Sequence, residues 1–547
     1  MEDAERALPQ QAGQDENALE KHDTISPQDQ DGHEVEPSDS LRKVPTLNKA
    51  VSLPREIFVV GLITLAQFTT QVGLGQTLSI LHVIADSFGI TQPGIESWLI
   101  AGYSLTVGTF ILLSGRLGDV FGYKRMLIIA YAWFAIWEMV AGLSVYSNYV
   151  LFIWARVLMG IGPSIALPNS LALLALLYEP GRRKNMAFAV FGATAPAGSI
   201  IGSAFAALLA LPSAWWPWTF WSSAIVLAVA STMVAWFIPD PQVTPALPGS
   251  LRATFQMLDL PAAAVGITAL VLINFAWNQA PIVGWHAAYV PVCLALGVLL
   301  LPVFFYLEIR VSSEPLIPFS ALNSTTAFVL GCVACGWANF GIWIFYLWQI
   351  LEVLRGTSPL LASAYLTPLV ISGAAAAINL LFGRLLAHVK PAWLMAIALS
   401  AFTASSLLIA TVPPNQTYWA QIFVTTIIAP WGMDMSFPAA TVYISNSIEK
   451  SKQGVAASLI NTVVNYSISL GLGFAGTVET HVNEGGVTAA DTLRGYRGAL
   501  YMGIGLAGLG LALSLSFLVK QYHDERKTAN ASSKDPRTLS RSEDHPR

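Results

Sequence analysis

Three ionisable side chains lie inside long apolar stretches of the sequence, at Glu138, Arg156 and Asp434. If such a stretch crosses a bilayer, a charge within it is costly unless it faces a partner or a water-filled cavity, so these residues are candidates for proton transfer. A carboxyl group can carry the proton, and a nearby arginine influences that exchange while it keeps its own proton. We therefore select Arg156, Asp434 and Glu138 as candidate functional residues, with Asp434 preferred over Glu138. The alternative is that each is a paired structural residue.

Uncharged polar side chains within the same stretches indicate where a small solute would bind. An unpaired amide in apolar surroundings is expensive, so each must meet either a ligand or another helix. Hydrogen bonds between helices explain any one of these side chains equally well. The candidates for a substrate cavity are Gln71, Asn169, Trp337, Asn339, Gln349, Asn379, Asn461 and Asn465.

The elements that carry these side chains are predicted to be membrane-spanning helices. Of the 547 residues, 54% are hydrophobic and 11% are charged, whereas an average soluble domain has about 25% charged residues. So few charged residues exclude a water-soluble fold. About 20 consecutive apolar residues suffice for a helix to span a bilayer, and the sequence contains many apolar runs of this length. The predicted fold class is an all-α polytopic membrane protein. Its fourteen helices are expected at approximately 57–79, 97–114, 126–146, 149–172, 186–210, 217–238, 259–280, 288–308, 326–349, 359–381, 392–412, 417–441, 455–478 and 499–519.

The distribution of charge orients these helices. An even number of spans places both termini on one side, and cytosolic loops are rich in Lys and Arg. With cytosolic termini, the inner loops carry twelve basic residues and the outer loops carry three, so we predict that both termini are cytosolic. Residues 1–50 hold twelve Asp and Glu against five Lys and Arg. We therefore predict a disordered acidic cytosolic tail at 1–55 and a second disordered cytosolic tail at 520–547.

Three short matches in the same order suggest an internal repeat. They are Gly115-Arg-Leu with Gly383-Arg-Leu and Arg183-Lys-Asn with Ser451-Lys-Gln, both at an offset of 268, and Leu167-Pro with Phe437-Pro at an offset of 270. Parallel halves of this kind are typical of transporters that hold substrate near the membrane midplane. We predict an N-terminal six-helix bundle at 56–240, a linker with two extra transmembrane helices at 241–320, and a C-terminal six-helix bundle at 321–519.

The residues from Gly115 to Arg125 form the most specific local pattern, Gly-Arg-Leu-Gly-Asp-Val-Phe-Gly-Tyr-Lys-Arg. Glycine permits a tight turn, an aspartate can meet a helix N-terminus, and adjacent basic residues favour the anionic leaflet. The pattern resembles motif A of the major facilitator superfamily, with Val120 and Tyr123 in place of two basic residues. A generic charged hairpin is the alternative. The predicted gating motif consists of Gly115, Asp119, Gly122, Lys124 and Arg125.

Two further segments resemble motifs of the same superfamily. Arg156 and Gly160 match motif B, although Met159 replaces a polar residue, and this resemblance implies a role for the arginine in proton transfer. The stretch that follows Phe191 resembles motif C of antiporter branches, in which small residues allow helices to approach closely and a proline loosens the backbone. Apolar packing without any role in antiport is the alternative. The residues of this antiporter-like helix are Gly192, Pro196, Gly198 and Gly202.

Five longer segments resemble the fungal 14-helix drug/proton antiporters, in particular the branch of aminotriazole-resistance and borate-efflux proteins. These segments cover residues 97–108, 183–186, 214–218, 432–438 and 461–469. The resemblance extends from the first predicted helix to the last. It implies a plasma-membrane exporter driven by inward proton flow, with the vacuolar membrane as the alternative location. Such a carrier needs a protonatable group, so the resemblance also implies proton coupling by Arg156, Asp434 and Glu138. The substrate that it implies is a small cytotoxic compound, borate or a secondary metabolite.

Other functions are excluded or disfavoured by the residues. The sequence has no Gly-Lys pair and therefore lacks the phosphate-binding loop of an ATP-driven pump. Its eight histidines show no HxxxH pattern, so we predict no metal site, no cofactor and no enzymatic activity. The predicted partners are a small-molecule substrate, protons and the lipid bilayer. We predict no nucleic-acid partner, and we expect the protein to be a monomer. A facilitator or proton symporter that imports a small solute stays open as an alternative. Asn415 is a predicted glycosylation site.

Overall fold

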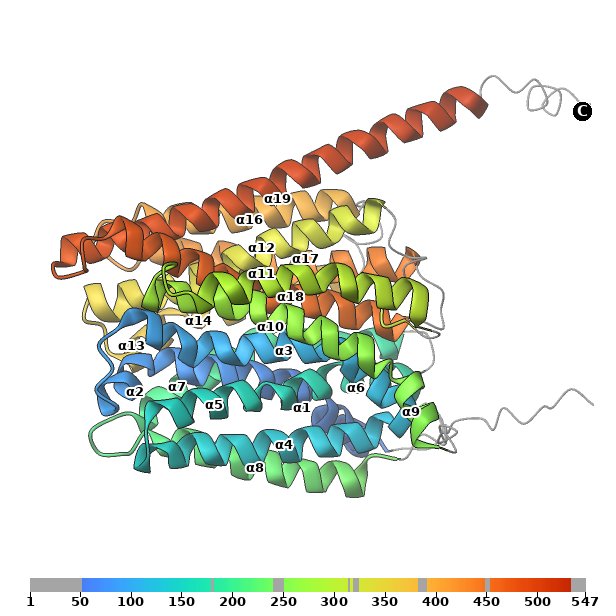
Figure 1. The fold of residues 1–547 in the computed structure, drawn as a ribbon, viewed down its shortest axis with the longest axis horizontal. Coiled ribbons are helices and arrows are strands. Elements are labelled where there is room, and N and C mark those ends of the chain that lie inside the picture. The colour runs from blue at the N-terminus through green and yellow to red at the C-terminus, as the bar shows by residue number, and fades with distance from the viewer. Residues whose placement is uncertain are drawn as a thin grey trace, which may run out of the picture. The chain divides into compact units, whose positions relative to one another are not determined.

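A computed structural model describes residues 52–178, 182–239, 250–312, 315–317, 324–381, 391–447 and 453–532. All regular elements in these ranges are helices, and none of the described residues lies in a strand. Backbone groups that cross a bilayer must find hydrogen-bond partners within the chain, and a helix satisfies them along a single segment. The long apolar runs therefore fold as the helices seen in Figure 1.

The helices fall into an N-terminal group, an intervening segment and a C-terminal group. The N-terminal group contains α1 (Leu53–Ser79), α2 (Leu81–Ser87), α3 (Pro93–Phe121), α4 (Tyr123–Leu143), the short helix η1 (Ser144–Tyr146), α5 (Tyr149–Met159), α6 (Ile161–Leu177), α7 (Arg182–Leu209) and α8 (Pro217–Phe237). The intervening segment contains α9 (Leu251–Met257), α10 (Leu260–Val283), α11 (Tyr289–Tyr306) and η2 (Leu307–Val311). The C-terminal group contains α12 (Ser324–Gln349), η4 (Ile350–Leu354), α13 (Pro359–Tyr365), α14 (Thr367–Leu381), α16 (Pro391–Ala410), α17 (Gln421–Ser447), α18 (Gln453–Val482) and α19 (Ala489–Ser532).

Twelve helical segments in the described ranges are long and apolar enough to cross a membrane. They coincide with twelve of the fourteen helices predicted from the sequence, and they confirm an all-helical fold. The other two predicted helices, 359–381 and 417–441, coincide with α13–α14 and with α17, which are not among the twelve. The predicted tails differ in outcome. Residues 1–51 lie outside the described ranges, whereas α19 continues to Ser532, so the start of the segment expected to be a disordered tail from residue 520 is helical.

Several helix boundaries follow from proline and glycine. Proline occupies the first turn of α1, α3, α8, α10 and α13, where its missing N–H leaves no helical hydrogen bond unmade. Gly122 separates α3 from α4 with φ of 93°, a conformation that other residues rarely adopt. The aligned prolines of the internal repeat, Pro168 and Pro438, both lie inside helices, α6 and α17. The residues at 383–385 and 451–452 that complete the other two matches lie outside the described ranges.

Packing connects the helices within each group and then joins the two groups. In the N-terminal group α1 packs on α7 and α4 packs on α8, while in the C-terminal group α16 packs on α17 and α12 packs on α19. The most extensive contacts between the groups are those of α3 with α18 and of α7 with α14, and α13 also packs on α7; we call the contacts of the first two pairs the seam. Helix α10 lies along both α3 and α18, so the intervening segment borders the seam. Small side chains allow this closeness, since a Cβ on Gly108 would lie 2.6 Å from the backbone nitrogen of Tyr466.

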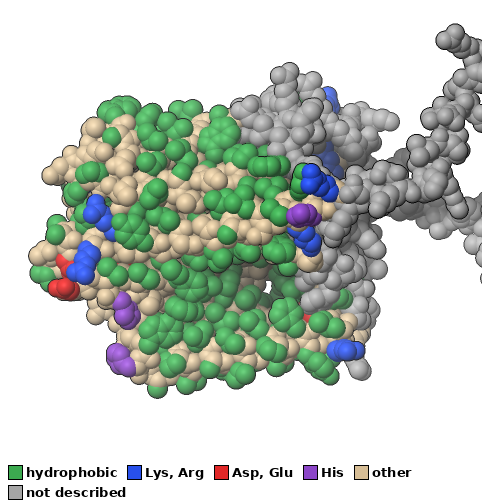
Figure 2. Space-filling view, turned by 90° about the horizontal axis from the view of Figure 1, so that it is seen from above, with side chains coloured by type: hydrophobic (Ala, Val, Ile, Leu, Met, Phe, Trp, Pro, Cys, Tyr) green, Lys and Arg blue, Asp and Glu red, His purple; other side chains and the backbone are tan. Residues whose placement is uncertain are grey.

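Successive helices run in opposite directions, so their connections alternate between two faces. We call these the α2 face, which also carries α13 and the α18–α19 loop, and the α9 face, which also carries the α3–α4 junction (Figure 1). Figure 2 shows charged side chains and histidines gathered towards these two ends, with a wide band of hydrophobic side chains between them. This arrangement is typical of a protein whose middle band faces lipid.

Candidate functional site

Arg156 of α5 is fully buried in the N-terminal group. Its Nε donates to the carbonyl oxygen of Leu99 at 3.0 Å, and its Nη1 lies 3.0 Å from the sulfur of Met159. Its Cζ lies 4.5 Å from the centroid of the Tyr103 ring, in a cation–π contact. Nη2 makes no hydrogen bond within the described part of the chain. The arginine is therefore held by α3 and its own helix, and Glu138 is its electrostatic partner.

Glu138 of α4 is buried beside this arginine and is also hydrogen-bonded. The Gln76 side-chain amide of α1 donates to both carboxyl oxygens, at 2.9 and 3.1 Å. The Ser223 hydroxyl of α8 in turn donates to Gln76 Oε1 at 3.0 Å. The sequence placed Asp434 ahead of Glu138 partly because its helix is the repeat mate of the helix that carries Arg156. In the structure, the acidic side chain that interacts electrostatically with Arg156 is Glu138 of the same group of helices, although the two form no ion pair within 4.0 Å.

Asp434 lies instead at the seam between the groups. Its Oδ2 is inaccessible and has no hydrogen-bond partner among the described residues. A Cβ on Gly373 of α14 would lie 2.8 Å from this oxygen and 3.1 Å from Cγ of Pro196 of α7. The candidate carboxyl group of α17 is thus next to the point where α14 meets the proline of the antiporter-like helix. The structure brings Asp434 and Pro196 together, which the sequence did not predict.

The glycines of the antiporter-like helix have different surroundings. A Cβ on Gly198 would meet the carbonyl oxygen of Phe68, and one on Gly202 would lie 2.9 Å from Cα of Val72, both in α1. Gly192 is exposed and a Cβ there would meet no atom within 4 Å. Close packing of α7 on α1 therefore explains Gly198 and Gly202, as the packing alternative states, but it does not explain Gly192.

The gating motif lies at the α9 face. Tyr123, which replaces a basic residue of the family pattern, donates its hydroxyl to Asp119 Oδ1 at 2.6 Å. A Cβ on Gly115 would lie 2.9 Å from the hydroxyl oxygen of Ser458 in α18, so the motif touches the seam. Arg116 donates to the carbonyl oxygen of Pro315, which ties the motif to the linker before α12. Of the two basic residues at the start of α4, Lys124 is half-buried and Arg125 is exposed.

Several candidates for the substrate cavity are instead bonded between helices. Asn169 donates to the carbonyl oxygens of Ser114 and Ile165 and is buried. Asn339 donates to the carbonyl oxygen of Phe402 and accepts from Ser406. For Asn339 the structural alternative is sufficient, whereas the Oδ1 of Asn169 is buried without a hydrogen-bond partner among the described residues.

The other six candidates are less uniform. Trp337 donates to the Ser436 hydroxyl at 3.1 Å, and Asn465 donates to the carbonyl oxygen of Asn461 at 3.0 Å. Gln71 is half-buried at the α1–α7 contact, and the side chain of Asn379 lies outside the described part of the structure. Gln349 is buried near the α2 face, beside His82. The described contacts do not bring these eight candidates together in one cavity.

Sequence reasoning missed a cluster at the α2 face. His82 lies between Glu96 and Glu352, and Tyr346 donates to Glu479 nearby. Each of these glutamates occupies the first or last turns of a long apolar helix at this face, a signal that could have grouped them. Asn415 is exposed in the α16–α17 loop of the same face, where a glycosylation site would have to be.

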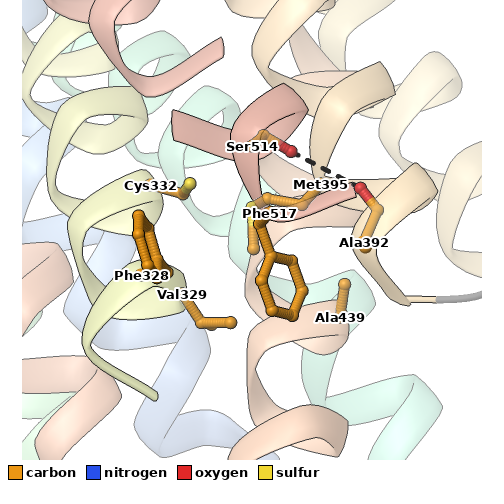
Figure 3. Close-up of a pocket in the computed structure, with 8 residues that line it drawn as sticks. All are labelled: Phe328, Val329, Cys332, Ala392, Met395, Ala439, Ser514 and Phe517. Atoms are coloured by element: carbon orange, nitrogen blue, oxygen red, sulfur yellow. Dashed lines mark hydrogen bonds between the residues drawn. The ribbon is translucent and has the colours of Figure 1, made fainter. Parts of the chain in front are cut away.

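A small cavity between α12, α16, α17 and α19 is shown in Figure 3. Its lining is mostly apolar and includes Phe328, Met395 and Phe517, while the Ser514 hydroxyl is turned towards the carbonyl oxygen of Ala392 at 3.4 Å. Its volume of about 10 Å³ holds no more than one water molecule. This cavity is too small for a transported solute.

Comparisons with known proteins agree with the fold. The sequence profile described as Major Facilitator Superfamily matches residues 63–472 and 326–542. The peptide transporter POT, crystallised as a mutant with sulfate, superposes with a TM-score of 0.60 over 88% of this chain and 97% of its own, at 14% identity. This likeness shows a shared fold.

Three curated relatives align over most of their length. The low affinity ammonium transporter of Saccharomyces cerevisiae is 50% identical over 482 residues, 87% of this chain and 91% of its own. Efflux pump terG of Aspergillus terreus is 44% identical over 470 residues, 85% and 87% of the two chains. The aminotriazole resistance protein of S. cerevisiae is 37% identical over 475 residues, 86% and 85% of the two chains. The predicted resemblance to fungal drug-efflux proteins is confirmed.

Proposed function

Because the chain belongs to the Major Facilitator Superfamily, a family of transporters and not of enzymes, we propose that it exports a small toxic compound or secondary metabolite in exchange for protons. Two of its relatives are named for efflux or for resistance to a toxic compound, which supports export. The exchange would proceed by alternating access, in which the two groups of helices rock about the seam.

The observation that carries the proton coupling is the position of Asp434. Its carboxyl group lies next to Gly373 of α14, where Pro196 of α7 approaches from the other group, and its Oδ2 has no hydrogen-bond partner among the described residues. A carboxyl group at such a seam changes its surroundings when the groups move, so its proton affinity differs between the two states. Glu138 and Arg156 are paired within one group, and in this proposal they are the second candidates for proton transfer.

The topology that we propose has fourteen spans. Helix α17 has 27 residues and packs along α16 and α14, and the α13–α14 segment packs on α7. In this proposal α17 and the α13–α14 segment are the two spans that join the twelve apolar ones. The bundles then cover 56–240 and 321–519, and the linker of 241–320 adds α10 and α11. In this proposal the α9 face, which carries the basic loops, is cytosolic, and so are both termini. The protein acts as a monomer in the plasma membrane. Substrate enters from the α9 face and leaves at the α2 face.

A second candidate is the import of a small solute on the same fold. The relative named as a low affinity ammonium transporter favours it, because it is 50% identical. A facilitator of this kind would equilibrate its solute without any need for a proton gradient.

Transport into proteoliposomes distinguishes these candidates. We would measure the uptake of labelled aminotriazole and of labelled methylammonium with an acidic lumen, with an acidic exterior and with no pH difference. Accumulation that requires an acidic lumen and that a protonophore abolishes is expected for a proton antiporter. Liposomes without protein correct for passive trapping of the amine. Uptake that is equal under all three conditions contradicts the proposal and favours a facilitator, and accumulation with an acidic exterior favours a symporter.

The coupling residue is tested in the same vesicles with Asp434→Asn. This variant keeps the shape of the side chain but cannot bind a transported proton, so downhill exchange should persist while accumulation driven by the pH difference is lost. Glu138→Gln is the comparison. If Asp434→Asn accumulates substrate as the unmodified protein does, Asp434 is not the coupling residue.

A further inference from the structure

A histidine bridges the two groups of helices at the α2 face. His82 of α2 lies with Nδ1 3.5 Å from Glu96 Oε2 and with Nε2 3.8 Å from Glu352 Oε2. Glu96 belongs to α3 of the N-terminal group, whereas Glu352 belongs to η4 of the C-terminal group. The side chains of Glu96 and Glu352 are 13% and 6% exposed, so the bridge is largely shielded from water. Glu96 and Glu352 therefore move away from each other when the two groups of helices separate at this face.

The surroundings of this bridge are acidic. Asp86 of α2 and Glu479 of α18 are close enough to Glu96 to interact with it electrostatically. Tyr346 of α12 donates to Glu479 Oε2 at 2.7 Å, and Tyr496 of α19 faces both Glu96 and Glu479. The Gln349 side chain of α12 lies next to the ring of His82. Glu352 Oε1 has no hydrogen-bond partner among the described residues. Three carboxyl groups thus surround His82, and a fourth, that of Glu479, interacts with one of them.

From this geometry we propose that His82, Glu96 and Glu352 form a proton-binding latch that holds the two groups of helices together at the α2 face. The latch is a site for protons that is separate from Asp434 and from the Glu138–Arg156 pair. It goes beyond the proposed function, since a latch at this face would serve an exporter and an importer alike.

The number of carboxyl groups sets the direction of the pH effect. Closure brings negative charges together in a shielded place, and bound protons relieve their repulsion. His82 acts in the opposite sense: burial lowers its pKa from 6.5, partly offset by the neighbouring Gln349 side chain and by the charge of Asp86. On its own, His82 would make closure less favourable as the pH falls below 6.5. The carboxyl groups outnumber it, so closure takes up protons overall and acid favours the closed latch.

The consequence for transport is that protons arriving at the α2 face close that face. A carrier that has released its substrate there would bind protons, close, and return to the state that is open at the α9 face. The latch therefore links proton arrival to the return step, whichever solute is carried.

Distance measurements across the latch test this proposal without any transported solute. Ser147, which follows η1, and Val487 in the α18–α19 loop are exposed at the α2 face on different groups. Spin labels on cysteines at these two positions, after replacement of the native Cys293, Cys332 and Cys335, report the separation of the groups in lipid nanodiscs. We expect one short distance in acid and a growing population at longer distance as the pH rises. The ratio of open to closed molecules should change by up to about tenfold per pH unit for each proton released.

Variants assign the effect to the cluster. Glu352→Gln and Glu96→Gln keep the side-chain shape but remove a titrating charge, so each should weaken the dependence of the distance on pH and favour the closed latch at high pH. Glu484→Gln is the matched control, because Glu484 is an exposed acid at the same face that pairs with Arg494 at 3.3 Å outside the cluster. It should keep the pH profile of the unmodified protein.

Three results would overturn the latch: distances that do not change with pH, opening in acid, or an unchanged profile in both Glu352→Gln and Glu96→Gln. If one of these two variants does not insert into the membrane, the other still decides. Failure of proton-driven transport in proteoliposomes bears on the proposed function and not on the latch, since the distances are measured without substrate.

Discussion

At the scale of single residues, the surroundings of Asp434 depend on glycine at position 373. A Cβ there would lie 2.8 Å from Asp434 Oδ2 and 3.1 Å from Pro196 Cγ, closer than atoms normally approach. We expect Gly373→Ala to displace the carboxyl group, to abolish pH-driven accumulation, and to cost about 1–3 kcal/mol through overpacking. Gly505→Ala is the control, because a Cβ at Gly505 meets no atom within 4 Å. Normal accumulation by Gly373→Ala in proteoliposomes would argue against a coupling role for this carboxyl group.

The Glu138–Arg156 pair makes a different prediction at the same scale. Glu138 and Arg156 are both buried and interact electrostatically, although they form no ion pair within 4.0 Å. Removing the carboxyl group leaves the buried cation less compensated, which costs up to about 3–5 kcal/mol. We expect Glu138→Gln to lower the thermal stability in detergent strongly, and Glu138→Gln with Arg156→Gln to recover part of that loss. The coupling free energy from the double-mutant cycle is the measurement. Additive effects of the two changes would show that Arg156 is stabilised by its hydrogen bond to Leu99 and its cation–π contact with Tyr103 rather than by Glu138.

At the scale of helices, contact between the backbones of α1 and α7 determines which glycines tolerate a side chain. Gly198 and Gly202 lie against the α1 backbone, while Gly192 of the same helix is exposed. We expect Gly198→Val to reduce the amount of folded protein in the membrane severely, and Gly192→Val to leave it nearly unchanged. Fluorescence-detected size-exclusion chromatography of tagged variants measures both. Equal tolerance at the two positions would mean that α1 and α7 do not pack as closely as described.

The helices of the intervening segment are tied to the seam by polar contacts. The Ser469 hydroxyl of α18 lies 3.0 Å from both the Ala101 carbonyl oxygen of α3 and Asn274 Oδ1 of α10. Asn278 of α10 donates to the Ser469 carbonyl oxygen at 3.2 Å. Helix α10 therefore contacts both groups at once, and any relative motion of α3 and α18 must either preserve or break these bonds.

At the scale of the whole molecule, the sequence predicts the helices better than their partners. The length of an apolar run alone determines that 217–238 crosses a membrane, and α8 occupies 217–237. The rotation of a helix about its axis depends on packing against helices far away in sequence, which hydropathy does not encode. For this reason Glu138 could not be recognised as the partner of Arg156. The same holds for His82 and Glu352, whose proximity depends on the contact between two groups of helices.

The orientation of the molecule yields the last prediction, because the excess of basic residues predicts that the α9 face is cytosolic. Gln256 is exposed on α9, whereas Val487 is exposed in the α18–α19 loop at the α2 face. In intact fungal spheroplasts, a maleimide that cannot cross membranes should label Val487→Cys and should label Gln256→Cys only after permeabilisation. Enzymatic removal of N-glycans gives an independent check, since a mobility shift that is lost in Asn415→Gln would place the α16–α17 loop on the same side as Val487. Labelling of Gln256→Cys in intact spheroplasts would reverse the orientation, and protection of both cysteines would place the protein in an internal membrane instead of the plasma membrane.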